Sequence, residues 1–288
     1  MRPANLVVIM SDEHHPHAMG VAGHPFVATP NLDRLAAAGT RFDTAYCNSP
    51  ICVPSRASFA TGRYVHALEN WDNAMAYDGS VPGWGHALQR RGNRVDSIGK
   101  LHYRDADSPT GFDRQYHPMH IYGGYGMVWG ALRGGEADFT ERAHVMMHPM
   151  GAGMSKYNIY DDRIASEAER WLADAAAAPS DQPWVLYLGF VAPHFPLTVP
   201  QEFLDGYPPD QMARPRLHPA DGTPRHPWLQ RSHELHPVDD GLDDAGRLLA
   251  TACYYGLCSW IDHQVGRVMA ALETSGLSQN TRVIYTSD

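Results

Sequence analysis

The residues best suited to chemistry lie in the stretch CNSPICVPSRASFATGRY, residues 47–64. Cys52 opens a run of proline, serine and arginine that continues as a helical pattern, and Arg56 follows about one turn later. A helix N-terminus and a guanidinium both favour negative charge, so the stretch predicts an anion site. The thiol is either a buried small side chain or a nucleophile that needs a histidine base, and the sequence leaves both open.

Alternating strand and helix patterns would position these residues. The strand patterns lie at residues 5–10, 41–47, 93–100, 183–196 and 281–288. The helical patterns lie at residues 29–39, 54–62, 83–92, 161–177 and 243–276, and Thr29 is the expected cap of the first. This order predicts an α/β fold in which a large, mostly parallel sheet lies between helices. Residues 103–155 and 197–241 show no clean period and are interpreted as long loops.

Polar side chains stand where the predicted strands end. They are Asp12, Lys100, His102, His194 and Asp288. In parallel sheets, ligands bind beyond the carboxyl ends of the strands, so these side chains are expected to converge. Cys253 and Cys258 lie in an apolar helical pattern and are expected in the core.

Composition narrows the class of protein. A formal charge of −9 in 288 residues argues against nucleic acid or an anionic membrane as partner. Four cysteines are too few for a disulfide scaffold, and no apolar stretch reaches membrane-spanning length. No secretory leader is visible, so we expect a cytoplasmic protein, or a periplasmic one if a leader is missing from this sequence. A homo-oligomer is compatible with the sequence.

The segment CVPSRASFATGR (52–63) resembles the sulfatase signature, Cys-x-Pro-Ser-Arg followed by Thr-Gly-Arg. Four further stretches resemble the same family in the same order: NLVVIMSDE at the start, GKLH (99–102), APHFP (192–196), and IDHQVGRVMAAL with TRVIYTSD in 261–288. The chain is thereby identified as a member of the type I, formylglycine-dependent sulfatases, and it looks most like their choline-sulfatase-like bacterial branch. The resemblance implies an alkaline-phosphatase-like fold. Residues 1–288 would be the N-terminal catalytic domain, with a smaller C-terminal part missing after the strand that ends at Asp288.

The resemblance also implies a nucleophile and a metal. Cys52 would be oxidised to formylglycine by a dedicated formylglycine-generating enzyme, with Pro54, Ser55 and Arg56 as part of the signal. One calcium ion would be held by hard oxygen ligands. The metal ligands implied are Asp12, Glu13, the modified Cys52 and Asp288. Glu13 stands where many relatives carry Asp, and the next ligand would be residue 289.

The remaining site residues follow from the same resemblance. Arg56 would hold the charge of the nucleophile and the sulfate, and Lys100 would neutralise the sulfate. His102 would take the proton of the nucleophile, and His194 would bind sulfate or act as general acid. Asn73 stands where some members carry an amide that faces the substrate.

The implied activity is hydrolysis of a small organic sulfate ester to an alcohol and inorganic sulfate. One alternative is a phosphonate or phosphate ester hydrolase of the same superfamily, although Lys100 and His102 favour sulfate over phosphonate. Another is an inactive fragment that only binds anions. Choline sulfate would require an aromatic cage, for which Tyr122, Tyr125 and Trp129 are candidates.

Overall fold

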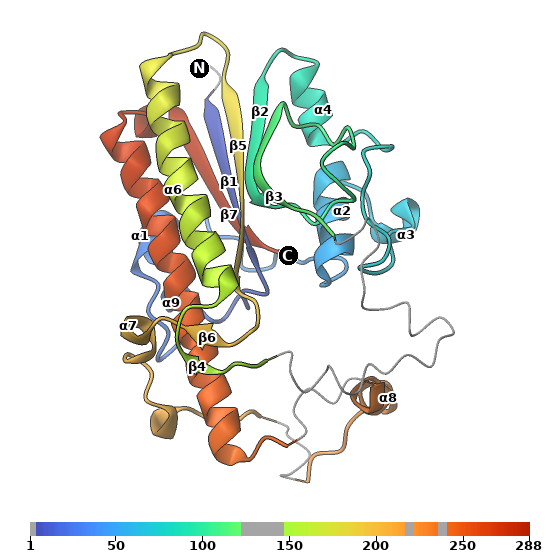
Figure 1. The fold of residues 1–288 in the computed structure, drawn as a ribbon, viewed down its shortest axis with the longest axis vertical. Helices are drawn as coiled ribbons and strands as arrows, with labels where there is room; N and C mark the ends of the chain where they lie inside the picture. The colour runs from blue at the N-terminus through green and yellow to red at the C-terminus, as the bar shows by residue number, and fades with distance from the viewer. Residues whose placement is uncertain (1–3, 122–146, 217–221, 236–240) are drawn as a thin grey trace.

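The computed structural model describes residues 4–121, 147–216, 222–235 and 241–288. Five parallel strands form one sheet in the order β3-β2-β5-β1-β7 (Figure 1). They are β1 (Asn5–Asp12), β2 (Arg94–Lys100), β3 (Arg114–Met119), β5 (Trp184–Pro193) and β7 (Thr281–Ser287). A separate parallel pair joins β4 (Gly151–Ala152) to β6 (Thr198–Val199).

Helices cover both faces of the sheet. The long helices α6 (Lys156–Ala177) and α9 (Asp244–Thr274) pack on one face, and α2 (Cys52–Thr61) and α4 (Trp84–Gln89) pack on the other (Figure 1). The other α-helices in the described part of the chain are short: α1 (Pro30–Ala37), α3 (Val65–Leu68), α7 (Gln201–Leu204) and α8 (Pro227–Leu235). The predicted α/β class with a parallel sheet between helices is confirmed.

The interior strands β1 and β5 contain continuous apolar runs because both of their faces are buried. In β1, Val7 and Ile9 join the core under α6 and α9, while Val8 and Met10 join the core under α2. This alternation is the two-residue period of a strand, and it explains the continuous apolar run at residues 5–10. Cys253 and Cys258 of α9 are fully buried, as expected.

Two predictions about helix starts are wrong in detail. Helix α2 begins at Cys52 rather than at Pro54, so the cysteine is its first helical residue. Thr29 does not cap α1. The carboxylate of Asp262, in α9, instead accepts hydrogen bonds from the backbone N–H of Asn31 and Leu32 at 3.1 and 2.7 Å. A cap supplied from so far along the chain leaves no local sequence signal.

Three segments differ from the sequence interpretation. Residues 197–241, interpreted as a long loop, contain β6, α7 and α8. Residues 41–47 contain no strand, and Phe42 and Tyr46 are 77% and 89% exposed, because no sheet edge lies beside them. Within 103–155, interpreted as a long loop, β3 forms an edge of the main sheet. Tyr122, Tyr125 and Trp129 lie outside the described residues. Among the helices that the structure describes, none is long and apolar enough to cross a membrane.

Candidate active site

Four strand ends and one helix start meet at one edge of the sheet. Asp12 ends β1, Lys100 ends β2, and Asp288 follows β7. Figure 1 shows the end of β7 beside α2, whose first residue is Cys52. Donor atoms of Asp12, Cys52 and His194, which follows β5, lie within 4.8 Å of one another. The convergence predicted from the strand ends is confirmed for these residues.

Arg56 connects the cluster. Its Nε donates to Asp288 Oδ2 at 2.7 Å and its Nη2 to Asp12 Oδ2 at 3.1 Å. Its Nη1 donates to the carbonyl of Lys100 at 2.8 Å and to the Tyr187 hydroxyl at 3.0 Å. Burial opposes the charge, but the carboxylates of Asp288 and Asp12 outweigh it and raise the pKa of Arg56. The guanidinium is therefore a fixed buried cation whose three nitrogens are all satisfied.

Asp12 and Lys100 form a second buried ion pair, with Lys100 Nζ in direct contact with Asp12 Oδ2. Burial would raise the pKa of Asp12, but Lys100 and Arg56 together lower it below its ordinary value. Burial likewise opposes the charge of Lys100, and the Asp12 carboxylate raises the pKa of the ammonium. Both groups are charged at neutral pH although both are buried.

Gly99 allows Lys100 to turn toward this cluster. Its φ is +92°, and the pairing of β2 with β3 shifts register between Ile98 and Lys100. A Cβ at this position would lie 2.4 Å from the Gly189 carbonyl oxygen and 2.6 Å from Ile164 Cδ1. Only glycine fits both the backbone conformation and the space.

Cys52 is buried as a neutral thiol. Its Sγ lies 3.4 Å from Asp12 Oδ1, and burial together with the Asp12 carboxylate raises the thiol pKa above its ordinary value. Among the described residues, no histidine hydrogen-bonds to this sulfur. A thiolate nucleophile with a histidine base, one of the two alternatives left open by the sequence, is therefore disfavoured.

His194 presents a lone pair to the site. Its Nδ1 lies 2.6 Å from the Phe195 carbonyl oxygen, so Nδ1 carries the proton of the neutral ring. Nε2 then faces Glu13 Oε1 at 3.6 Å. Burial and the Lys100 cation lower the pKa of His194 to about 4, so the imidazole is neutral at pH 7. The ring of Tyr157, from the first turn of α6, packs edge-on against it.

His102 has an unsatisfied nitrogen. Its backbone has φ +52°, and its N–H donates to the Met119 carbonyl at 2.8 Å. Its Nδ1 is buried and makes no hydrogen bond within the described part of the chain. Burial and the cation of Lys100 lower the pKa of His102 to about 2. A buried imidazole without a partner suits a ring that binds a proton or a ligand from outside the protein.

Asn73 and Glu13 stand at the border of the cluster. The side-chain oxygen of Asn73 accepts the backbone N–H of Val53 at 3.0 Å, so it satisfies one of the free amides at the start of α2. The oxygen predicted to face the substrate is thus used in supporting the helix that carries Cys52. Glu13 is 45% exposed, and its backbone N–H donates to Asp288 Oδ1 at 3.2 Å.

The donor set fits a divalent cation. Three carboxyl groups, of Asp12, Glu13 and Asp288, surround two buried cations, Arg56 and Lys100, which leaves one formal negative charge over. Partial burial and the Asp12 carboxylate raise the pKa of Glu13 to about 7. Burial also raises the pKa of Asp288, with the Asp12 carboxylate acting in the same direction. A hard dication would stabilise the ionised form of the two carboxyl groups whose pKa is raised, those of Glu13 and Asp288.

Sequence reasoning missed Asp161. This fully buried carboxyl of α6 accepts the N–H of Val191 at 2.8 Å and of Ala192 at 3.0 Å, where the pairing of β5 with β1 shifts register. It thereby holds the backbone just before His194. The available signal was a carboxyl on the apolar side of an amphipathic helix.

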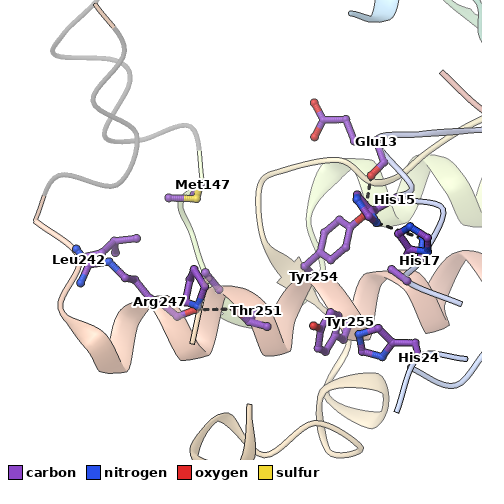
Figure 2. Close-up of a pocket in the computed structure, with 13 residues that line it drawn as sticks. Glu13, His15, His17, His24, Met147, Leu242, Arg247, Thr251, Tyr254 and Tyr255 are labelled. Atoms are coloured by element: carbon purple, nitrogen blue, oxygen red, sulfur yellow. Dashed lines mark hydrogen bonds between the residues drawn. The ribbon is translucent and has the colours of Figure 1, made fainter. Parts of the chain in front are cut away.

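Sequence reasoning also missed a pocket of about 730 Å³ beside the cluster (Figure 2). Glu13 belongs to its lining, together with His15, His17 and His24. The loop histidines of the sequence gave no reason to group these three, since they carry no motif. Their shared feature is the proximity of the loop after β1 to α9, which only the fold shows.

Comparison with known proteins agrees with this arrangement. The Sulfatase family model matches residues 4–288, and the chain belongs to this family. This chain is 27% identical to a choline-sulfatase of Rhizobium meliloti over 99% of the chain. It is 26% identical to an arylsulfatase of Clostridium perfringens over 100% of the chain. The chain spans only 57% and 63% of these two relatives.

Solved structures share the fold. A phosphonate monoester hydrolase of Agrobacterium radiobacter superimposes with a TM-score of 0.76 at 23% identity, over 99% of this chain and 62% of that one. A protein solved in complex with its substrate, D-glucosamine-2-N,6-O-disulfate, has a TM-score of 0.66 at 22% identity, over 99% of this chain and 65% of that one. At these identities the likeness establishes the fold alone.

Proposed function

We propose that this chain is the catalytic part of a sulfatase that hydrolyses an organic sulfate ester to an alcohol and inorganic sulfate. One observation carries the proposal: Cys52 begins a helix directly beside Asp12, and the buried cations Arg56 and Lys100 both contact that carboxylate. Membership of the sulfatase family and the similarity to a choline-sulfatase and an arylsulfatase support the sulfate ester as substrate.

The proposal requires a converted Cys52 and a divalent cation, for which we favour calcium. When present, the formylglycine supplies a hydrated aldehyde as nucleophile and the cation offsets the negative charge around it. Asp12, Asp288 and Glu13 would hold the cation through their carboxylate oxygens. A formylglycine-generating enzyme is the partner that such a protein needs, and we expect both to act in the cytoplasm.

The residues of the chain then divide the work by charge. Lys100 and Arg56 attract the sulfate group and hold it against the start of α2, where the amide dipoles add to the attraction. His102, with its free Nδ1, accepts a proton from the nucleophile's hydroxyl groups. His194 faces the site with Nε2. Once this nitrogen is protonated, it donates a hydrogen bond to the sulfate or delivers its proton to the leaving oxygen.

The alternative reaction is hydrolysis of a phosphonate or phosphate ester, to which the fold of the Agrobacterium enzyme points. Turnover of an aryl sulfate and of the matching aryl phosphonate, measured with one protein preparation, separates the two. We expect the sulfate to be the better substrate, as judged by kcat/KM.

The decisive experiment is the fate of two cysteines in one peptide. The protein is expressed at its natural length with a formylglycine-generating enzyme, alkylated and digested with trypsin. The mass of the peptide 42–56 is then measured by mass spectrometry. We expect Cys47 to be alkylated and Cys52 to be converted. Cys52→Ala should abolish turnover of an aryl sulfate, by roughly 10³-fold or more, while Cys47→Ala retains it. An active protein whose Cys52 remains an alkylatable thiol would refute the mechanism.

A further inference from the structure

One face of α9 forms a wall of the pocket beside the reaction centre (Figure 2). The residues on this face follow helical spacing: Arg247, Ala250, Thr251, Tyr254 and Tyr255. The opposite wall comes from the loop after β1, through His15, Ala18 and His24. The volume of about 730 Å³ suits a small organic molecule.

The pocket is joined to the reaction centre through Tyr254. Its hydroxyl donates to the Glu13 carbonyl at 2.7 Å and accepts the backbone N–H of His15 at 2.8 Å. Glu13 follows Asp12 directly and itself lines the pocket. A sulfate ester held at Cys52 would therefore extend its organic part along α9.

The middle of the pocket is apolar and uncharged. Tyr254, Tyr255 and Ala250 present rings and a methyl group, and Leu242 and Met147 lie at one end (Figure 2). Burial lowers the pKa of His24, whose Nδ1 already accepts the N–H of Val27 at 2.9 Å. This imidazole is neutral and adds no charge to the wall.

Arg247 is the cation at the end remote from Glu13 (Figure 2). Its side chain is 19% exposed, and its ion-pair contact is a long one of 3.4 Å to Asp244 Oδ1. Asp244 also contacts the guanidinium of Arg214, so its charge is shared. Nε of Arg247 is buried and makes no hydrogen bond within the described residues. The charge of the Arg247 guanidinium is therefore only partly offset by Asp244, whose carboxylate also contacts Arg214.

The length of the helix sets the distance between the two ends. Arg247 precedes Tyr254 by seven residues, which corresponds to roughly 10 Å along an α-helix. A ligand that reaches from the reaction centre to Arg247 must bridge about this length.

We propose that the pocket selects sulfate esters whose alcohol part is apolar or aromatic and ends in a carboxylate that Arg247 binds. This inference rests on the proposed function. The guanidinium of Arg247, which lines the pocket, matches a planar carboxylate of charge −1. A quaternary ammonium group is disfavoured beside Arg247, because the carboxylate that contacts this guanidinium, that of Asp244, is already paired with Arg214 as well.

The kinetic test pairs two substrates that differ only in charge. They are the sulfate ester of 3-(4-hydroxyphenyl)propionate and the same ester with the carboxylate replaced by an amide. Arg247→Leu should lower kcat/KM for the carboxylate roughly 10- to 100-fold, mainly through KM, and change the amide substrate less than about threefold. Arg247→Lys should restore part of the loss. Arg104→Leu, an exposed arginine that does not line the pocket, is the control.

An equal loss for both substrates, or no loss for either, would overturn the inference, and so would a preference for choline sulfate over the carboxylate ester. Binding of 3-(4-hydroxyphenyl)propionate itself, measured by calorimetry, provides a readout that needs no turnover. We expect Arg247→Leu to weaken this binding at least about tenfold while the unfolding temperature stays unchanged. If no sulfate ester is hydrolysed, 4-nitrophenyl sulfate included, the proposed function fails, and the binding result alone then decides the role of Arg247.

Discussion

Two arginines mark the two ends of the proposed substrate path, and they are held in opposite ways. Arg56 is 1% exposed, and each of its three nitrogens has a hydrogen-bond partner. Arg247 is 19% exposed and has a long contact of 3.4 Å with a shared carboxylate, and its Nε has no hydrogen-bond partner among the residues that the structure describes. The first arginine is fixed by the strands and helix that converge on it, whereas the second retains binding capacity.

This difference implies that the residues for turnover and the residues for substrate preference lie in separate parts of the molecule. The charged centre is built from strand ends and a helix start, which the sheet topology brings together whatever the substrate is. The pocket is built from one helix face and a loop, where residues change without disturbing the sheet. A change in the centre should therefore affect stability and turnover together, and a change in the pocket should affect substrate preference.

Exchange of each arginine for glutamine tests the contrast most strongly. Arg56→Gln leaves the buried carboxylates of Asp12 and Asp288 short of positive charge, and should lower the free energy of unfolding by about 3–5 kcal/mol. Arg247→Gln breaks a single long contact and should cost less than about 1 kcal/mol. Urea unfolding followed by circular dichroism measures both. Similar losses in the two variants would contradict the contrast.

Asp161, which holds the backbone just before His194, should make the stability of the fold depend on pH. Burial raises the pKa of Asp161 from 3.8 to about 7. The folded protein binds this proton more tightly than the unfolded chain, so Asp161 stabilises the fold below about pH 4 and this contribution is lost as pH rises toward 7. Asp161→Asn cannot titrate, and the stability of the wild type relative to this variant should fall by at most about 4 kcal/mol over that range.

Unfolding curves collected at several pH values from 4 to 8 measure this difference. The matched control is Asp162→Asn, since the neighbouring carboxyl is 56% exposed and pairs with Arg267 at the surface. A gap between wild type and Asp161→Asn that does not change with pH would show that the buried carboxyl is ionised throughout.

The glycine beneath Lys100 gives the smallest of the three effects. Gly99→Ala would place a Cβ 2.4 Å from the Gly189 carbonyl oxygen, and should cost about 2 kcal/mol and displace Lys100 from Asp12. Gly92→Ala is the control, because Gly92 has a similar φ of +80° but open space around a Cβ. It should cost about 1 kcal/mol, from backbone strain alone. Equal unfolding free energies in the two variants would argue against the steric role.

Much of the fold was accessible from the sequence because strands buried on both faces are continuous apolar runs. The segments of β1 and β5 show this pattern. Polar residues of the site mark the strand ends: Asp12 ends β1, Lys100 ends β2, His194 follows β5 and Asp288 follows β7. Residues 41–47 alternate between polar and apolar side chains as a strand does, but they do not join the sheet. Periodicity alone does not show whether a predicted strand has another strand to pair with. The edge strand β3 was overlooked because its sequence, RQYHPM, carries little apolar signal.

For the site, the sequence allowed the residues to be identified, but not their hydrogen-bond partners. The charged and nucleophilic residues were found because a motif coincides with a strand end at Asp12 and Lys100, and with a helix start at Cys52. The use of Asn73 as support for α2, and the anchoring of β5 by Asp161, depend on hydrogen bonds between segments that are distant in sequence. Arg247 resembles any solvent-exposed helical arginine until the loop after β1 is seen opposite it.

The position of β1 between β5 and β7 has a consequence for the order of assembly. Its outer neighbour β7 is the last strand, and the contact of Glu13 with Asp288 spans 275 residues. The bond from Arg56 to Asp288 spans 232. A nascent chain therefore cannot close this cluster until nearly all of these residues have left the ribosome. Until then the sheet has not enclosed Cys52, so under the proposed function the formylglycine-generating enzyme would have access to it.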